Sequence, residues 1–204
     1  SFKDEVFTRN GNLKEKYTNI FQLLKCPYLN TEYLGILADT SLPSMKGNPL
    51  CDTRVRRAIS LSIDRGKLVQ YMRNNLGLAA TSGFLPSGMP LKSKNVLNTY
   101  CFNPDSAKKL LSLCGYSSQV QPEITISTTT DYLDICEYVQ HELSKTGIKL
   151  NIDVITGISF RQMMAFSKLP FFRASWLADY PDAENYYSLF YSKNFSPNGP
   201  NYTH

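Results

Sequence analysis

The segment from residue 123 to residue 154 constrains the fold most, because its apolar period changes from strand to helix and back. Ile124 and Ile126 alternate with polar residues, and the apolar residues of 148–154 alternate in the same way. Between these strands the apolar positions of 131–147 recur at helical spacing, behind Asp131 as the expected N-cap. A strand, a helix and a strand in this order predict two parallel strands joined by a right-handed crossover.

The flanking segments extend this pattern. Asp52 and Asp64 are good N-caps for two helices, and Asn103 followed by a proline opens a third that Gly115 ends. The alternation of strands and helices predicts an α/β fold with a mixed sheet flanked by helices. Further expected elements are a short helix in 13–24, an extended run in 27–37, strand and loop in 77–90, a helix in 158–167 and a strand in 170–176.

Composition argues against several function classes. The chain has 204 residues, a formal net charge of +5 and two histidines, His141 and His204. The cations are scattered, whereas nucleic-acid binding needs them gathered on one face, so we expect no nucleic-acid partner. Because the sequence has no histidine-based constellation, P-loop or metal-ligand spacing, we expect no enzyme, metal or cofactor. No apolar stretch approaches the roughly 20 residues that span a bilayer.

Two places could bind a ligand, since ligands of open α/β sheets lie beyond the carboxyl ends of the strands. One is the hydroxyl-rich turn 127–131, which could equally be an ordinary capping turn. The other is the run from Arg173 through Trp176 to Asp179 and Tyr180. Asp179 lies past the strand and could pair with an ammonium group, or it could serve a turn; Trp176 could instead be core. Strand alternation places Arg173 and Trp176 on opposite faces.

Several motifs resemble one known family. The run Asp52-Thr53-Arg54-Val55-Arg56-Arg57-Ala58-Ile59, ending in Ile63-Asp64-Arg65, is similar to a segment of the family 5 bacterial solute-binding proteins, the oligopeptide, dipeptide and nickel receptors of ABC importers. The runs 84–90 and 102–111 follow in the family's order. So does Trp176-Leu177-Ala178-Asp179-Tyr180, with Asn185 and Phe190 after it.

The resemblance implies a type II periplasmic-binding-protein lobe. Residues 28–204 would form the second ligand-binding lobe of a longer chain, and residues 1–27 a lead-in from the first lobe or hinge. In the peptide-binding members the aspartate at the position of Asp179 pairs with the peptide's α-ammonium, with Trp176 and Tyr180 beside the ligand. The arginine at the position of Arg173 can meet a peptide carboxylate.

The implied function is capture of oligopeptides outside the cytoplasm for delivery to permease subunits. The full-length protein would be a monomer, periplasmic or anchored as a lipoprotein, and would touch the membrane only through that anchor or the permease. Three alternatives stay open: a receptor for nickel, a glycan or another small solute in the same family, a basic nucleic-acid-binding module, and an unrecognised hydrolase.

Overall fold

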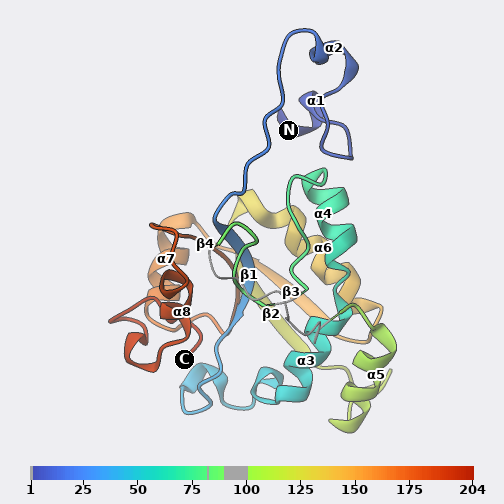
Figure 1. Ribbon diagram of the computed structural model, residues 1–204. Helices are drawn as coiled ribbons and strands as arrows, with labels where there is room; N and C mark the ends of the chain where they lie inside the picture. The colour runs from blue at the N-terminus through green and yellow to red at the C-terminus, as the bar shows by residue number, and fades with distance from the viewer. Residues whose placement is uncertain (1, 82, 90–100) are drawn as a thin grey trace.

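The computed structural model describes residues 2–81, 83–89 and 101–204, and its centre is a four-stranded mixed sheet (Figure 1). Strand β2 pairs in parallel with β3 and with β4, whereas β1 pairs antiparallel with β4, which gives the order β1-β4-β2-β3. The expected α/β architecture and the parallel pairing of the strand–helix–strand unit are therefore confirmed. The strands are β1 (Asn30–Ile36), β2 (Glu123–Thr128), β3 (Lys149–Val154) and β4 (Phe171–Leu177).

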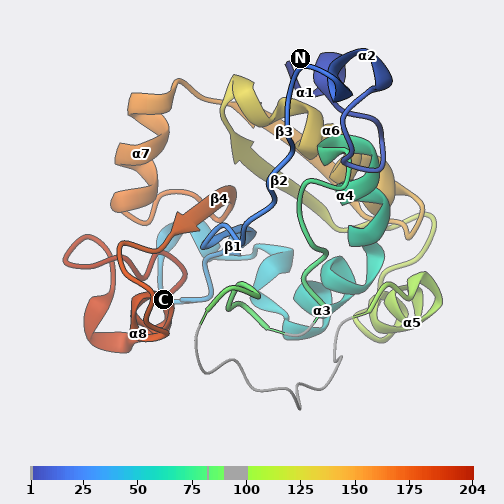
Figure 2. The ribbon, with the colours of Figure 1, turned by 45° about the horizontal axis from the view of Figure 1, so that its top comes forward.

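Helices cover the two faces of this sheet unequally. Figure 2 shows α7 on one side and α3, α4 and α6 on the other. The short helices α1 and α2 lie before the sheet in sequence, and α8 follows β4. The helices are α1 (Phe2–Val6), α2 (Glu15–Thr18), α3 (Thr53–Ser62), α4 (Arg65–Arg73), α5 (Pro104–Leu113), α6 (Leu133–Ser144), α7 (Gly157–Ala165) and α8 (Glu184–Tyr187).

Alternation along β4 divides the core in two. Phe171 is fully buried with Ile126 and Leu143 in the cluster that α3, α5 and α6 complete. Phe172, the next residue, points to the other face and packs with Phe160 of α7. Consecutive side chains of one strand thus serve two separate cores, as the two-residue period of a strand requires.

Three of the expected helix caps are confirmed. The side chain of Asp52 accepts a 2.8 Å hydrogen bond from the amide of Arg54 at the start of α3. Asp64 accepts one at 3.0 Å from the amide of Lys67, and Asn103 caps α5 in the same manner. Each satisfies an amide that the first helical turn leaves without an intrahelical acceptor.

Three local expectations were wrong. Asp131 does not cap α6: residues Thr130–Tyr132 form a 3-10 turn, and Tyr132 is the N-cap residue without a side-chain bond. The described parts of 77–90, namely 77–81 and 83–89, contain turns and loop but no strand. The helix expected in 13–24 is only the four-residue α2, consistent with the absence of buried residues on it.

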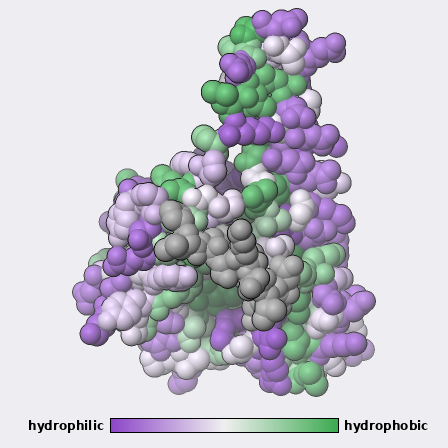
Figure 3. All heavy atoms as spheres, in the orientation of Figure 1, coloured by the Kyte–Doolittle hydropathy of each residue, from purple (hydrophilic) through white to green (hydrophobic). Residues whose placement is uncertain are grey.

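Residues 2–27 form an arm that stands away from the sheet beside the end of α4 (Figure 1). The side-chain amides of Asn74 and Asn75 hold it, the first by donating to Asp4 Oδ1 at 3.2 Å and the second to the Arg9 carbonyl at 2.8 Å. Ile20 and Leu24 are exposed on it, and Figure 3 shows apolar atoms gathered there. The boundary between residues 27 and 28 stays a prediction. Within the described residues, no helix is long and apolar enough to cross a membrane.

Candidate functional site

The carboxyl ends of β2, β3 and β4 lie at one edge of the sheet, because these strands run in the same direction. Strand β4 bridges β2 at Phe172, opposite Ser127, and then continues to Leu177. Since β1 is antiparallel to β4, its first residues reach the same edge: Asn30 lies opposite Leu177. This is the edge at which open α/β sheets bind ligands.

Asp179 occupies this edge two residues after β4 ends. Its carboxylate is exposed, and it makes no hydrogen bond or ion pair with any residue that the structure describes. An unpaired carboxylate on a turn fixed by β4 can accept a charge-assisted hydrogen bond from a cation without first breaking an internal contact. Tyr180, 48% exposed, follows it directly.

A hydrogen bond to helix α8 fixes the Trp176 side chain. Its indole Nε1 donates a 2.7 Å hydrogen bond to Oδ1 of Asn185, a residue of α8 that is 6% exposed. The hydroxyl of the fully buried Tyr186 donates to the Leu29 carbonyl at 2.6 Å and lies 3.3 Å from the Trp176 carbonyl. The indole is half-buried, so it offers a fixed aromatic surface at the edge.

Arg173 has a different environment. It is 6% exposed, its Nη2 lies 3.1 Å from Glu32 Oε2, and its Cζ lies 3.2 Å from the centre of the Tyr132 ring. Nη2 and Nε nonetheless donate no hydrogen bond among the described residues. Arg173 and Glu32 are therefore close enough to form an ion pair, but the geometry between them is not that of a hydrogen bond. A ligand reaching Arg173 would meet these two side chains first.

The structure thus brings only part of the predicted set together. Arg173 faces Tyr132 on the α6 side of the sheet, whereas Trp176 bonds to Asn185 of α8, so their opposite-face placement is confirmed. Asp179 and Tyr180 lie beyond the strand, where alternation no longer applies. In the turn 127–131, Thr128 is buried and Asp131 is exposed.

The sequence predicts no functional role for Glu32 or Tyr132, and it indicates Asn185 only as a landmark of the family resemblance. Glu32 stands in a strand where a charged side chain looks like an ordinary solvent-facing residue. Only the pairing of β1 with β4 puts it diagonally across from Arg173, and that pairing joins segments about 140 residues apart. Tyr132 has the apolar spacing of α6 and resembles a core residue.

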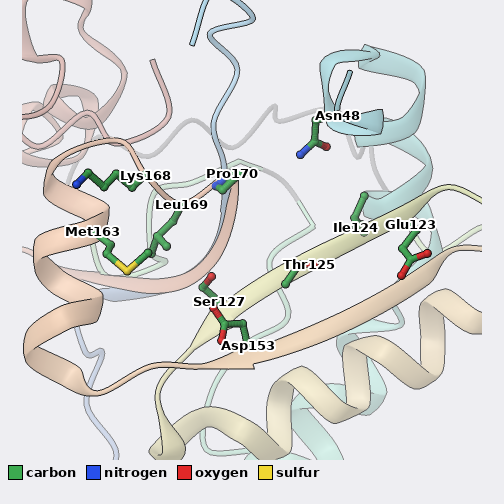
Figure 4. A pocket seen from close by; sticks show the side chains of 10 residues that line it. All are labelled: Asn48, Glu123, Ile124, Thr125, Ser127, Asp153, Met163, Lys168, Leu169 and Pro170. Atoms are coloured by element: carbon green, nitrogen blue, oxygen red, sulfur yellow. The ribbon is translucent and has the colours of Figure 1, made fainter. Parts of the chain in front are cut away.

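Two cavities lie on the α7 face, and none of the four predicted site residues lines either. The first, about 300 Å³, runs between α7 and the polar side of β2 and β3, where the paired Ser127 and Asp153 lie together (Figure 4). The second, about 190 Å³, is lined by aromatic side chains that include Tyr33 and Phe84. Burial raises the pKa of Tyr33 to about 12. Among the described residues, no three His, Cys, Asp or Glu side chains converge as a metal site.

The fold and this edge define a class, an α/β solute-binding lobe, and comparison with known proteins agrees. The model of the bacterial extracellular solute-binding proteins, family 5 Middle, matches residues 9–198. The chain belongs to that family. Its members bind solutes and are not enzymes, which confirms the expected absence of catalysis.

Two curated relatives and one solved structure show the degree of likeness. Heme-binding protein A of Haemophilus influenzae is 22% identical over 82% of this chain and 30% of its own length. The dipeptide-binding protein of Escherichia coli is 21% identical over 92% of this chain and 34% of its own length. The periplasmic murein tripeptide-binding protein MppA, in its unliganded open form, superposes with a TM-score of 0.73 at 22% identity, over 98% of this chain and 38% of its own. The chain thus spans about a third of these relatives, and its fold is that of the family.

Proposed function

We propose that this chain is one ligand-binding lobe of an ABC-importer receptor and that its ligand is a peptide held by its α-ammonium group at Asp179. The observation that carries the proposal is the exposed carboxylate of Asp179, which is unpaired among the described residues. It lies at the edge of the sheet where β2, β3 and β4 end, which we call the ligand edge. Beside it in sequence the Trp176 indole is fixed by Asn185. A carboxylate and a rigid aromatic surface suit a cationic terminus followed by a side chain.

Two further roles follow from the site. Tyr180 would border the ligand, since half of its side chain is open at the same turn. Arg173 would meet a ligand carboxylate only after exchanging Glu32 for it. The rest of the full-length protein would supply the opposite wall of the site.

The cellular setting is part of the same proposal. Related proteins act outside the cytoplasm, and the family's matched model describes extracellular solute-binding proteins. We infer that the full-length protein is a monomer, periplasmic or lipid-anchored, which delivers its ligand to permease subunits.

A second candidate ligand is haem or another small solute. It is favoured by the similarity to heme-binding protein A, at an identity close to that of the dipeptide-binding relative. Haem carries carboxylates and no ammonium group, so it would not use Asp179 as an ion-pair partner.

Calorimetric titration of the full-length receptor with a peptide library tests the proposal. Asp179→Asn should weaken binding of free-ammonium peptides at least about 30-fold, roughly 2 kcal/mol, as expected for a charge pair in a desolvated interface. Glu184→Gln is the matched control, because Glu184 is exposed nearby and its change removes the same charge.

N-acetylated peptides should bind the wild type and Asp179→Asn equally weakly. Peptide binding that Asp179→Asn leaves intact would keep the ligand class and reject the role of Asp179. Binding of haem without any peptide binding would favour the second candidate.

A further inference from the structure

Arg173 is enclosed by residues of this chain on two sides. The Tyr132 ring lies against the guanidinium, with its centre 3.2 Å from Cζ, and Glu32 Oε2 lies 3.1 Å from Nη2. With 6% of the side chain exposed, and Nε and Nη2 fully covered, the guanidinium presents almost no surface to a ligand. A buried cation needs a compensating anion, and Glu32 is the carboxylate in contact with it.

The register of the sheet fixes this pair. On β4, Arg173 is opposite Leu34, and Ser175 is opposite Glu32. Glu32 and Arg173 are thus diagonal neighbours on one face, within reach of long side chains. Because both backbones are locked by ladder hydrogen bonds, the contact does not depend on a loop.

A second cation strengthens the position of Glu32. Nη2 of Arg73, at the end of α4, lies 3.3 Å from the same oxygen, Oε2. Two guanidinium groups on one oxygen hold the carboxylate against rotation away from Arg173. Glu32 is 41% exposed, so the side of the cluster open to solvent is its carboxylate and not the guanidinium of Arg173.

We propose that Glu32 is a specificity-determining residue: its carboxylate fills the place at Arg173 that a ligand carboxylate would need, so Arg173 does not select ligands by a carboxylate. The ligand is then selected by its ammonium end. This part of the inference rests on the peptide function proposed above. Peptides ending in a carboxylate, in an amide or in further residues should be accepted alike.

The first test is independent of peptides. In the full-length receptor, Glu32→Ala opens a carboxylate-sized space beside two guanidinium groups and should lower Tm by several degrees in chloride buffer. Acetate at about 100 mM and matched ionic strength should restore at least half of that loss. Glu123→Ala, which removes the exposed partner of Lys149, should gain nothing from acetate. In Glu32→Ala with Arg173→Met, where only the Arg73 guanidinium remains beside the space, acetate should restore clearly less than in Glu32→Ala alone.

The second test compares each bound peptide with its C-terminal amide. Wild type should bind the two forms within about 3-fold, and Glu32→Ala should prefer the free acid by about 10-fold or more. A wild type that already prefers the acid 10-fold, or a Glu32→Ala receptor without the acetate effect, overturns the proposal. If no peptide binds any variant, the peptide function fails, and the acetate measurement alone decides whether Glu32 occupies Arg173.

Discussion

The indole of Trp176 and the side-chain amide of Asn185 form a 2.7 Å hydrogen bond between the end of β4 and α8. The acceptor is nearly buried, so the bond lies beneath the ligand edge and not on the surface. It makes Asn185 a positioning residue: it touches no ligand in our proposal, yet it sets the angle at which the aromatic surface is presented.

Replacing Asn185 by leucine should therefore affect both stability and binding. The indole N–H would lose its acceptor, which would cost about 1–3 kcal/mol for a buried donor and costs less here because Trp176 is only half-buried. We expect a lower midpoint in urea denaturation and a weaker affinity for any ligand that rests on Trp176. Asn198→Leu, an exposed change in the same C-terminal segment, is the control and should change neither. Unchanged affinity in Asn185→Leu would remove Asn185 from the site.

Asp52 should make the start of α3 sensitive to acid. Its carboxylate accepts hydrogen bonds from the side chain and the amide of Arg54, and these contacts lower its pKa from 3.8 to about 2. Because the pKa is lower in the folded state, the stabilisation is present above about pH 4 and is lost as pH falls towards 2.

Asp52→Ala should cost about 1 kcal/mol at pH 7, the usual value of an N-cap. The difference from wild type should shrink between pH 4 and pH 2, measured as the free energy of unfolding at each pH. Asp131→Ala, which removes an exposed carboxylate that caps no helix, should show no such trend. A penalty that stays constant down to pH 2 would contradict the assigned cause.

Gly35 should tolerate no side chain. A Cβ there would overlap two ring atoms of Phe172, which is buried between β4 and α7. Gly35→Ala should destabilise the protein by about 1–3 kcal/mol through overpacking. Gly77→Ala is the matched control, since nothing lies within 4 Å of its added Cβ. Partial recovery in Gly35→Ala with Phe172→Leu, measured by thermal unfolding, would identify the ring as the obstacle.

The local elements were predictable because their signals are local. Asp52 and Asn103 predict helices that begin directly after them, and the alternation around Ile126 indicates which face of its strand is buried. The place of Asp179 just past the end of β4 was likewise visible in the sequence, whereas its pairing with an ammonium group came from the family resemblance and stays a proposal. The capping role expected of Asp131 was wrong because the 3-10 turn Thr130–Tyr132 precedes α6. Tyr132, at the end of that turn, contacts Arg173 of β4, a segment distant in the sequence.

Long-range contacts could not be predicted in this way. Nothing near Glu32 in sequence indicates that β1 runs antiparallel beside β4, and only that register brings Glu32 to Arg173. The role of Asn185 depends likewise on how α8 folds back under Trp176. The helix caps at Asp52, Asp64 and Asn103 could be predicted from one segment, whereas contacts that join two distant segments could not.

The two hydrogen bonds that the Leu29 carbonyl accepts affect how a movement of the chain would reach the ligand edge. The carbonyl accepts hydrogen bonds from the Ala178 amide at 2.9 Å and the Tyr186 hydroxyl at 2.6 Å, and Leu29 is the last residue before β1. The Leu29 carbonyl therefore joins three segments of the chain: the residues that lead into β1, the turn that carries Asp179, and helix α8, which lies beneath Trp176. A motion that displaces the Leu29 carbonyl from the turn after β4 would therefore break both bonds.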